Sequence, residues 1–307
     1  MKKLIRKSLI LIALVLFFAG CASAGGGNSS NVFMLTILHT NDLHGRLENM
    51  PLYSTIVSQV RSEVAANGGN VLLLDGGDLY RRGPYQRFHG AAETEVFNAM
   101  KYDAIVFGNN EFPANDNELI DMSQHTILQM AEFSVLCGNV TVNGNYIEGI
   151  EPYIIKNMNG VNVAIIGITT TSPQFNRTSF ATQAVFSEPI TTLVELAEQV
   201  KDISDIRIAL SHAGFNTDIL MRNVNVIVGG HSHTKLALPH VIRDGQNLIP
   251  IVQAGGEEDN NLGRLDLVFR KRRGQWVLTE YMGYLFLLND VEPDLEIQEI
   301  LDKYNRR

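Results

Sequence analysis

Side chains that can bind metals follow several short apolar runs of the 307-residue chain. The set is Asp42, His44, Asp78, Asn109, His212, His231 and His233. Each member comes directly after a run that predicts a β-strand, and sites in α/β proteins form outside the carboxyl ends of strands. We therefore expect five separate strand ends to bring these residues into one crevice.

The residue types in this set indicate the chemistry. Mixed imidazole and carboxylate ligands suit Zn, Mn, Fe or Co rather than Ca or Mg. Seven side chains exceed the needs of one tetrahedral ion and suffice for two ions that share a carboxylate. Two such ions lower the pKa of a bound water and clamp phosphoryl oxygens, so that hydroxide can attack phosphorus in line. Taken singly, each residue is more often a turn or loop residue, and only their joint placement indicates a site.

Alternating strand and helix patterns must position these residues. Apolar runs predict strands at 34–38, 71–74, 104–107, 133–136, 206–210 and 226–228. Helical spacing predicts helices at 52–64, 91–100, 119–132, 191–200, 218–222 and 293–304. A hairpin turning at 159–160 joins strands at 153–155 and 161–168, and further strands are expected at 249–253, 265–269 and 276–280. Because no linker-like segment interrupts this pattern, we expect one α/β domain over residues 33–307.

The order of these motifs resembles that of the calcineurin-like metallophosphoesterases. The strings ILHTNDLHGRLE, LLLDGGD, YDAIVFGNNEF, ALSHAG, VIVGGHSHT and VQAGG are similar to the bacterial 5'-nucleotidase/2',3'-cyclic phosphodiesterase family. The similarity runs from about residue 35 to residue 301. It implies a four-layer α/β/β/α sandwich and a metal-dependent phosphoric ester hydrolase. The implied substrate is a small phosphorylated molecule such as a nucleotide.

The resemblance also implies how the ligands divide between two metals. One metal would be held by Asp42, His44, Asp78 and His233. The other would be held by Asp78, Asn109, His212 and His231. Asp78 would then be the bridge between the two.

This chain departs from the family pattern in its third motif. The family has Gly-Asn-His-Glu-Phe-Asp, where the His contacts the phosphoryl group and the Asp orients that His; here the two positions are Asn110 and Pro113. Asn110 can donate a hydrogen bond to a phosphate oxygen, but it cannot supply a proton at neutral pH. Such proton transfer is worth about 10²–10⁴-fold, so we expect weakened hydrolysis of esters with poor leaving groups. His89, His125 or a water are the candidate substitutes.

A second departure concerns nucleobase recognition. Family nucleotidases carry a C-terminal domain that stacks the base between aromatic side chains, whereas this chain ends at Arg307, after the metal-bearing domain. We therefore expect relaxed specificity. The loop 81–85 (Arg-Arg-Gly-Pro-Tyr) follows Asp78 and is either a phosphate- or ring-binding loop or simply an exposed basic one.

The N-terminus predicts export. A basic segment and an apolar run too short to span a membrane precede Cys21, and residues 18–21 resemble a bacterial lipobox with Phe18 in place of the usual Leu. We expect a signal peptide over 1–20, a lipidated Cys21 that anchors the protein in a membrane, and a flexible tether over 21–32. The location is then periplasmic or at the cell surface. Cys137 lies in an apolar segment and is expected to be a buried, inert thiol.

Composition narrows the choice of partners. The net charge is −8, and removing the basic N-terminus makes the remainder more acidic, which argues against nucleic acid as a partner. Two functions remain open. The first is an exported phosphohydrolase that scavenges phosphate or nucleotides, and the second is a lipoprotein that binds metal or a phosphorylated ligand without turnover. The metal ligands support both, the complete nucleophile-generating site favours the first, and Asn110 with Pro113 favours the second.

Overall fold

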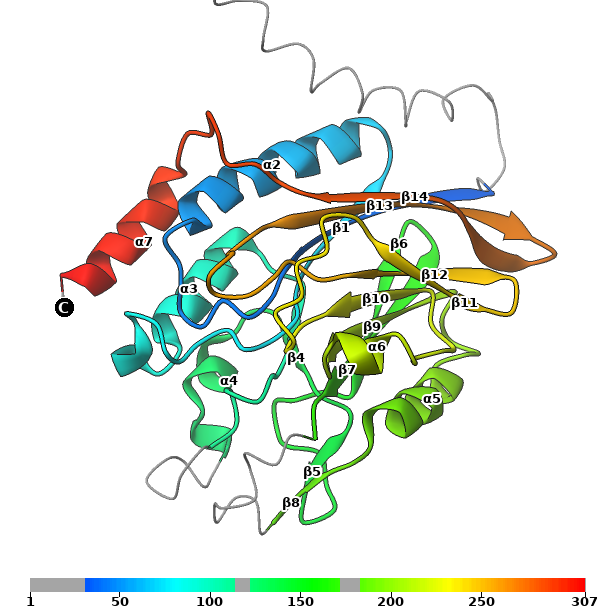
Figure 1. The fold of residues 1–307 in the computed structure, drawn as a ribbon, viewed down its shortest axis with the longest axis horizontal. Helices are drawn as coiled ribbons and strands as arrows, with labels where there is room; N and C mark the ends of the chain where they lie inside the picture. The colour runs from blue at the N-terminus through cyan, green and yellow to red at the C-terminus, as the bar shows by residue number, and fades with distance from the viewer. Residues whose placement is uncertain (1–30, 114–121, 172–182, 307) are drawn as a thin grey trace, which may run out of the picture.

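A computed structural model describes residues 31–113, 122–171 and 183–306, and these contain two six-stranded sheets (Figure 1). The first sheet has the strand order β14-β13-β1-β2-β3-β4. Neighbours among β1 to β4 run parallel, while β13 and β14 add an antiparallel edge. The strands are β1 (Val32–Thr40), β2 (Asn70–Asp75), β3 (Ala104–Val106), β4 (Ser134–Leu136), β13 (Gly263–Arg272) and β14 (Gln275–Leu285).

The second sheet has the order β11-β12-β10-β9-β7-β6. Its central strands pair in parallel, and β11 and β6 form its antiparallel edges. The strands are β6 (Tyr153–Met158), β7 (Val161–Thr169), β9 (Ile206–His212), β10 (Val226–Gly229), β11 (His240–Asp244) and β12 (Asn247–Val252). A separate antiparallel pair joins β5 (Val140–Val142) to β8 (Ala184–Phe186).

The two sheets face each other across an apolar core. Side chains of both sheets pack there with almost no exposed area, among them Ile37, Leu72, Val106, Ile165, Ile208 and Val228. Helices α2 (Met50–Ala66), α3 (Ala91–Met100), α4 (Thr126–Met130) and α7 (Leu295–Asn305) lie with the first sheet's outer face, and α5 (Pro189–Gln199) and α6 (Phe215–Asp218) lie with the second's (Figure 1). Because each sheet buries both faces, its central strands are continuous apolar runs. The four-layer α/β/β/α sandwich implied by the sequence is confirmed.

Most elements expected from the sequence are present, and the helix at 91–100 has the observed bounds. Two expected helices are wrong. In the described part of 119–132, a 3₁₀ turn (Met122–Gln124) and the short α4 are separated by His125, whose ring nitrogen accepts the N–H of Ile127 and caps α4. The helix expected at 218–222 is instead α6, which ends at Asp218 and is followed by tighter turns, in which the N–H groups of Leu220 and Met221 donate to the carbonyl oxygens of Thr217 and Asp218. Strands β5, β8 and β11 were not expected, since short or half-exposed strands leave little apolar pattern.

The N-terminal predictions concern residues that the structure does not describe. The expected signal peptide, Cys21 and nearly all of the tether lie before residue 31. Among the described residues, no helix has both the length and the apolarity needed to cross a membrane. Cys137, which follows β4, is buried, and burial raises the pKa of its thiol to about 12.

Candidate metal centre

The carboxyl ends of five strands meet at one end of the sandwich. β1, β2 and β3 come from the first sheet, and β9 and β10 come from the second. Gly76 follows β2 and Gly230 follows β10, and a Cβ atom on Gly230 would lie 2.3 Å from the carbonyl oxygen of Gly76. Only glycine permits this approach of the two sheets. All seven predicted ligands lie at these ends: Asp42, His44, Asp78, Asn109, His212, His231 and His233.

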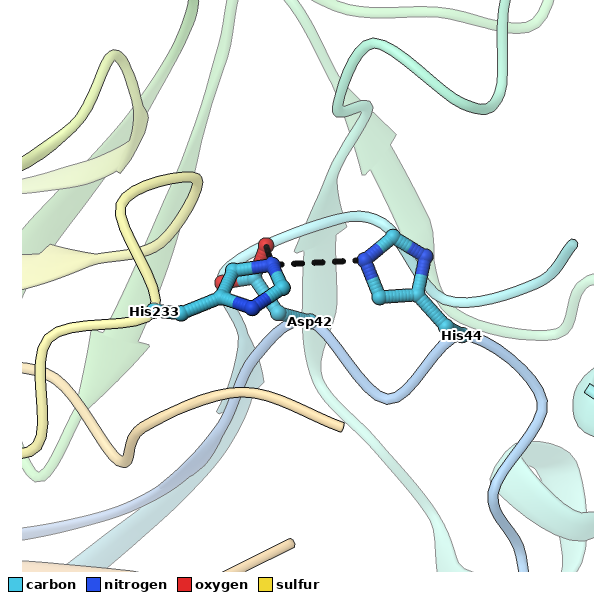
Figure 2. A group of neighbouring side chains, drawn as sticks. All are labelled: Asp42, His44 and His233. Atoms are coloured by element: carbon cyan, nitrogen blue, oxygen red, sulfur yellow. Dashed lines mark hydrogen bonds and ion pairs between the residues drawn. The ribbon is translucent and has the colours of Figure 1, made fainter. Parts of the chain in front are cut away.

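One close group joins Asp42, His44 and His233 (Figure 2). The Nε2 atoms of His44 and His233 face each other at 3.4 Å. Nε2 of His233 lies 3.3 Å from Oδ1 of Asp42. Asp42 and His44 are fully buried, whereas the His233 side chain is 36% exposed. This group therefore opens to solvent on the His233 side.

A second close group joins Asp42, Asp78 and His212, and all three are buried. Nε2 of His212 lies 3.4 Å from Oδ1 of Asp78 and 4.0 Å from Oδ1 of Asp42. Its other ring nitrogen, Nδ1, donates to the carbonyl oxygen of Gly76 at 2.6 Å. That bond fixes the ring so that Nε2 points at the carboxylates.

Asp78 reaches both groups through different oxygens. Its Oδ1 faces His212 at 3.4 Å and its Oδ2 faces His44 at 3.7 Å. Asp78 therefore lies within reach of both groups. Asp42 also belongs to both close groups, which the resemblance did not imply.

The remaining two predicted ligands lie beside these groups. The ring of His231 packs against that of His212 with centroids 5.1 Å apart, and its backbone N–H donates to Oδ2 of Asp42 at 2.9 Å. Asn109 lies in the loop that follows β3, and it is buried. Among the described residues, neither close group of acidic and imidazole side chains includes His231.

The backbone is strained at most of these positions. Five of the seven predicted ligands have positive φ angles between 48° and 70°: Asp42, His44, Asp78, His231 and His233. Such left-handed conformations cost of order 1–3 kcal/mol each for residues with a side chain, and they cluster at functional sites. The strain turns each side chain sharply from its strand towards the common centre.

Charges and burial shift the titration of these groups in opposite directions. Burial alone would raise the pKa of Asp78, but His212 and His44 hold it below its ordinary value. Burial opposes the protonation of His212, but Asp78 and Asp42 raise its pKa to about 10. Burial lowers the pKa of His44 and of His231. The carboxylates thus favour positive charge at the centre of the site.

The structure also gives a role to Glu111, which belongs to the third motif but is not one of the predicted ligands. Its buried carboxylate accepts the backbone N–H groups of Asp78 (3.0 Å), Leu79 (2.8 Å) and Gly108 (2.7 Å). These groups belong to the loops after β2 and β3. Glu111 therefore holds two ligand-bearing loops together from behind.

Gln253 has the corresponding role in the second sheet. Its Nε2 donates to the carbonyl oxygen of Gly230 at 2.6 Å, and its Oε1 accepts from the backbone N–H of Thr234 and the hydroxyl of Ser232. These bonds fasten both ends of the loop that carries His231 and His233. Gln253 was not predicted from the sequence. The signal that could have indicated it is a polar amide side chain directly after the apolar strand β12.

Asn110 lies at the centre of the site. Its Nδ2 donates to Oδ2 of Asp78 at 2.6 Å, and its backbone N–H donates to Oδ1 at 2.8 Å. His125, one candidate to replace the missing proton donor, has both ring nitrogens engaged: Nε2 lies 2.9 Å from the carbonyl oxygen of Glu111, and Nδ1 accepts from Ile127. It has a structural role.

The donor atoms fit divalent metal ions. Ligands about 2.0–2.1 Å from a tetrahedral Zn²⁺ lie about 3.3 Å from one another. The separations His44–His233, His233–Asp42 and His212–Asp78 are 3.4, 3.3 and 3.4 Å. Within the described residues, the buried Nε2 of His212 makes no hydrogen bond, although it points at two carboxylates. A metal ion would satisfy that nitrogen.

Comparisons with known proteins show the family to which the chain belongs. Residues 35–235 match the family model of the calcineurin-like phosphoesterases. The chain is 32% identical over 311 residues to a 5'-nucleotidase of Vibrio parahaemolyticus, an alignment that covers 88% of this chain and 54% of that protein. It is 26% identical over 305 residues to a trifunctional nucleotide phosphoesterase of Bacillus subtilis, covering 88% of this chain and 20% of that protein.

Among solved structures, the 5'-nucleotidase precursor of Thermus thermophilus superimposes with a TM-score of 0.75 at 25% identity. The match covers 89% of this chain and 59% of that chain. The present chain thus spans about half the length of the nucleotidases that it matches.

Proposed function

The chain belongs to the calcineurin-like phosphoesterase family, and from that premise we propose that it is a metal-dependent hydrolase of small phosphoric esters. One observation carries the proposal. The Asp78 carboxylate lies between His44 and His212, with one oxygen towards each, and so joins two sets of metal-binding side chains. That arrangement suits two ions that share one ligand.

The chain's own residues define what the site can do. Divalent ions bound there would supply a nucleophile at neutral pH and polarise the phosphoryl group. Asp42 and Asp78 provide the negative charge that holds such ions, while Glu111 keeps the loops that carry Asp78 and Asn109 in place. Asn110 can turn from Asp78 to donate a hydrogen bond to a phosphate oxygen, but it has no proton to give to a leaving group. Substrates with good leaving groups should therefore react best.

A nucleotide is the substrate class that the relatives favour. The proteins from Vibrio parahaemolyticus and Thermus thermophilus are both named 5'-nucleotidases, but this chain spans only part of each. We therefore propose phosphorylated small molecules in general as substrates, with nucleotides as the first to test.

The test is hydrolysis of mono- and bis-nitrophenyl phosphate by the purified chain with added Mn²⁺ or Zn²⁺, with bound metal measured in parallel. We expect metal-dependent turnover, and we expect Asp78→Ala to release metal and abolish activity because it removes the shared ligand. Asp202→Ala, an exposed carboxylate next to α5, is the matched control and should behave as the parent. Full metal retention by Asp78→Ala would contradict the two-metal assignment.

The bonds of Asn110 to Asp78 favour a second candidate function, ligand binding without turnover. The double change Asn110→His with Pro113→Asp separates the two. If the missing proton donor limits an active hydrolase, this variant should raise turnover of alkyl phosphates more than that of nitrophenyl phosphates. Equal effects on both would count against the leaving-group argument. Two bound metals without turnover in the parent would establish the binding function.

We also propose that the protein is exported and lipid-anchored. The basis is the basic and apolar segment before Cys21, outside the residues that the structure describes. We expect cells to incorporate labelled fatty acid into the protein, and we expect the Cys21→Ser variant to lose that label. Unchanged labelling of that variant would contradict it.

A further inference from the structure

We propose that Arg82 is an anion-binding residue of the metal centre, whose guanidinium exchanges Glu257 for an oxygen of the substrate phosphate. The inference deepens the proposed function, on which it rests, by naming phosphomonoesters as the preferred substrates. It concerns the basic loop at 81–85, whose role the sequence left open.

The backbone fixes Arg82 next to a predicted ligand. The N–H groups of His44 and Gly45 donate to the carbonyl oxygens of Asp78 and Leu79, so the segments after β1 and β2 run together beyond their strands. Gly83 then packs on the His44 backbone, where a Cβ atom would lie 2.3 Å from the carbonyl oxygen. No larger residue fits there, and Arg82 is therefore held at the rim of the site.

The two adjacent arginines have different surroundings. Both have positive φ angles, 72° for Arg81 and 63° for Arg82. Arg81 donates to the carbonyl oxygen of Phe112 at 3.0 Å and lies over the ring of Tyr80. Arg82 instead has a side chain that is 49% exposed and faces Glu257. The side chain of Arg81 therefore has a structural role, whereas that of Arg82 is exposed enough to contact a bound ligand.

Glu257 approaches from the opposite side of the site. It follows Gly256, whose backbone lies against the ring of His233: a Cβ atom there would be 2.3 Å from Nδ1. The pair Arg82–Glu257 thus connects the segment beside His44 to the segment beside His233, the two imidazoles that face each other in Figure 2. Burial lowers the pKa of His44, and the charges of Arg82 and Glu257 both act on it as well, in opposite directions.

The ion pair is weak enough to exchange. Nη1 of Arg82 lies 3.7 Å from Oε1 of Glu257, longer than the 2.7–2.9 Å of a charge-assisted hydrogen bond. A half-exposed pair of this kind contributes little to stability. Guanidinium groups bind phosphate through two parallel hydrogen bonds, which is a stronger interaction. A phosphate at the metal centre can therefore displace Glu257.

This exchange favours substrates with more charge on phosphorus. A phosphomonoester carries close to two negative charges at pH 7, whereas a diester carries one and has one oxygen fewer to offer. The guanidinium of Arg82, which lies outside the set of metal ligands, would therefore stabilise a bound monoester more than a bound diester. Arg82 would in this way set a preference that the metal ligands alone do not.

The first test measures binding of inorganic phosphate to the Mn²⁺-loaded protein by titration calorimetry. We expect Arg82→Gln to weaken binding about 10- to 100-fold, the range for loss of a hydrogen bond to a charged group, and Arg82→Lys to weaken it less. Arg46→Gln is the matched control, because Arg46 is 46% exposed and pairs with Glu48 at 3.9 Å. Equal effects of Arg82→Gln and Arg46→Gln, or no phosphate binding by the parent protein, would overturn the inference.

The second test is a double-mutant cycle. Glu257→Gln should tighten phosphate binding about two- to fivefold, because it removes the competing partner of Arg82, and the gain should vanish in the Arg82→Gln background. A gain that persists without Arg82 contradicts the exchange. Thermal melting of each variant checks that it is folded.

Turnover separates this inference from the proposed function. We expect Arg82→Gln to lower kcat/KM about 10- to 100-fold for mono-nitrophenyl phosphate and far less for the bis ester. Equal losses on both esters would contradict the monoester preference. If the parent shows no turnover but loses phosphate affinity in Arg82→Gln, the hydrolase proposal fails and the anion-binding role of Arg82 stands.

Discussion

The two sheets make unequal contributions to the metal centre. The first sheet supplies both carboxylates, the amide and one imidazole: Asp42, Asp78, Asn109 and His44. The second sheet supplies only imidazoles: His212, His231 and His233. The part of the site on the first sheet (the first half) therefore carries the negative charge that would balance bound cations, and the part on the second sheet (the second half) would add imidazole ligands.

The side chains that hold the ligand-bearing loops in place also differ in charge between the two halves. In the first half, the buried carboxylate of Glu111 accepts backbone N–H groups from two loops. In the second half, the amide of Gln253 fastens the loop that carries His231 and His233. Burial raises the pKa of Glu111 to about 7, so above that pH its hydrogen bonds go to a charged group and contribute more than those of a neutral amide. Perturbations of the first half should therefore have the larger effects.

The largest effect is expected from Glu111→Gln. The glutamine keeps the shape but has one acceptor oxygen, so its NH₂ group would face backbone N–H donors that are buried. We expect a loss of about 3–5 kcal/mol of unfolding free energy, measured by urea denaturation of the metal-free protein. Glu132→Gln, on the surface after α4, is the control and should change stability little. A smaller loss of unfolding free energy than in the Gln253→Leu variant described below would contradict the expected ranking of the two halves.

The next effect concerns Glu93, a buried residue of α3 whose carboxylate lies close beneath Gly45 in the first half. Burial raises its pKa from 4.5 to about 7. The folded protein thus holds this proton more tightly than the unfolded chain does. The contribution of Glu93 is complete below pH 4.5 and is lost as the pH rises through about 7.

Glu93→Gln should remove this dependence. The difference in unfolding free energy between variant and parent should grow in favour of the variant by about 3 kcal/mol from pH 4.5 to pH 8. Thermal melts across this range, with and without EDTA, measure it. A constant difference between variant and parent would mean that Glu93 titrates normally.

The smallest effect is expected from Gln253→Leu. This change leaves the carbonyl oxygen of Gly230 and the N–H of Thr234 without their partner, at a cost of about 1–3 kcal/mol. Metal affinity should fall about 10- to 100-fold through the loosened His231–His233 loop, while the first half stays intact. Because His231 and His233 are expected to bind different metals, metal titration followed by calorimetry should detect weakened binding at both sites. Unchanged metal affinity at both sites would show that Gln253 does not hold this loop in place for metal binding.

Local patterns explain which elements could be predicted. The helix at 91–100 and the buried strands have strong apolar periodicity within one segment, so their existence follows from nearby residues alone. The segments at 119–132 and 218–222 have helical spacing, but in the first His125 caps a short helix at its start, and in the second the chain continues beyond Asp218 in tighter turns. His125 also bonds through Nε2 to the carbonyl oxygen of Glu111, 14 residues away, and a local pattern does not contain that partner.

For the site, the sequence by itself determined the types of the candidate ligands and their order along the chain. It also determined that the proton-donating position holds Asn110, because each of these facts is local to one strand end. Only the tertiary structure decided that Asp78 faces His44 and His212 at once, that Glu111 and Gln253 support the loops, and that Arg82 meets Glu257 at the rim. The physical reason is that the two sheets supply different ligands, and distances across a sheet interface arise from packing between segments far apart in the chain.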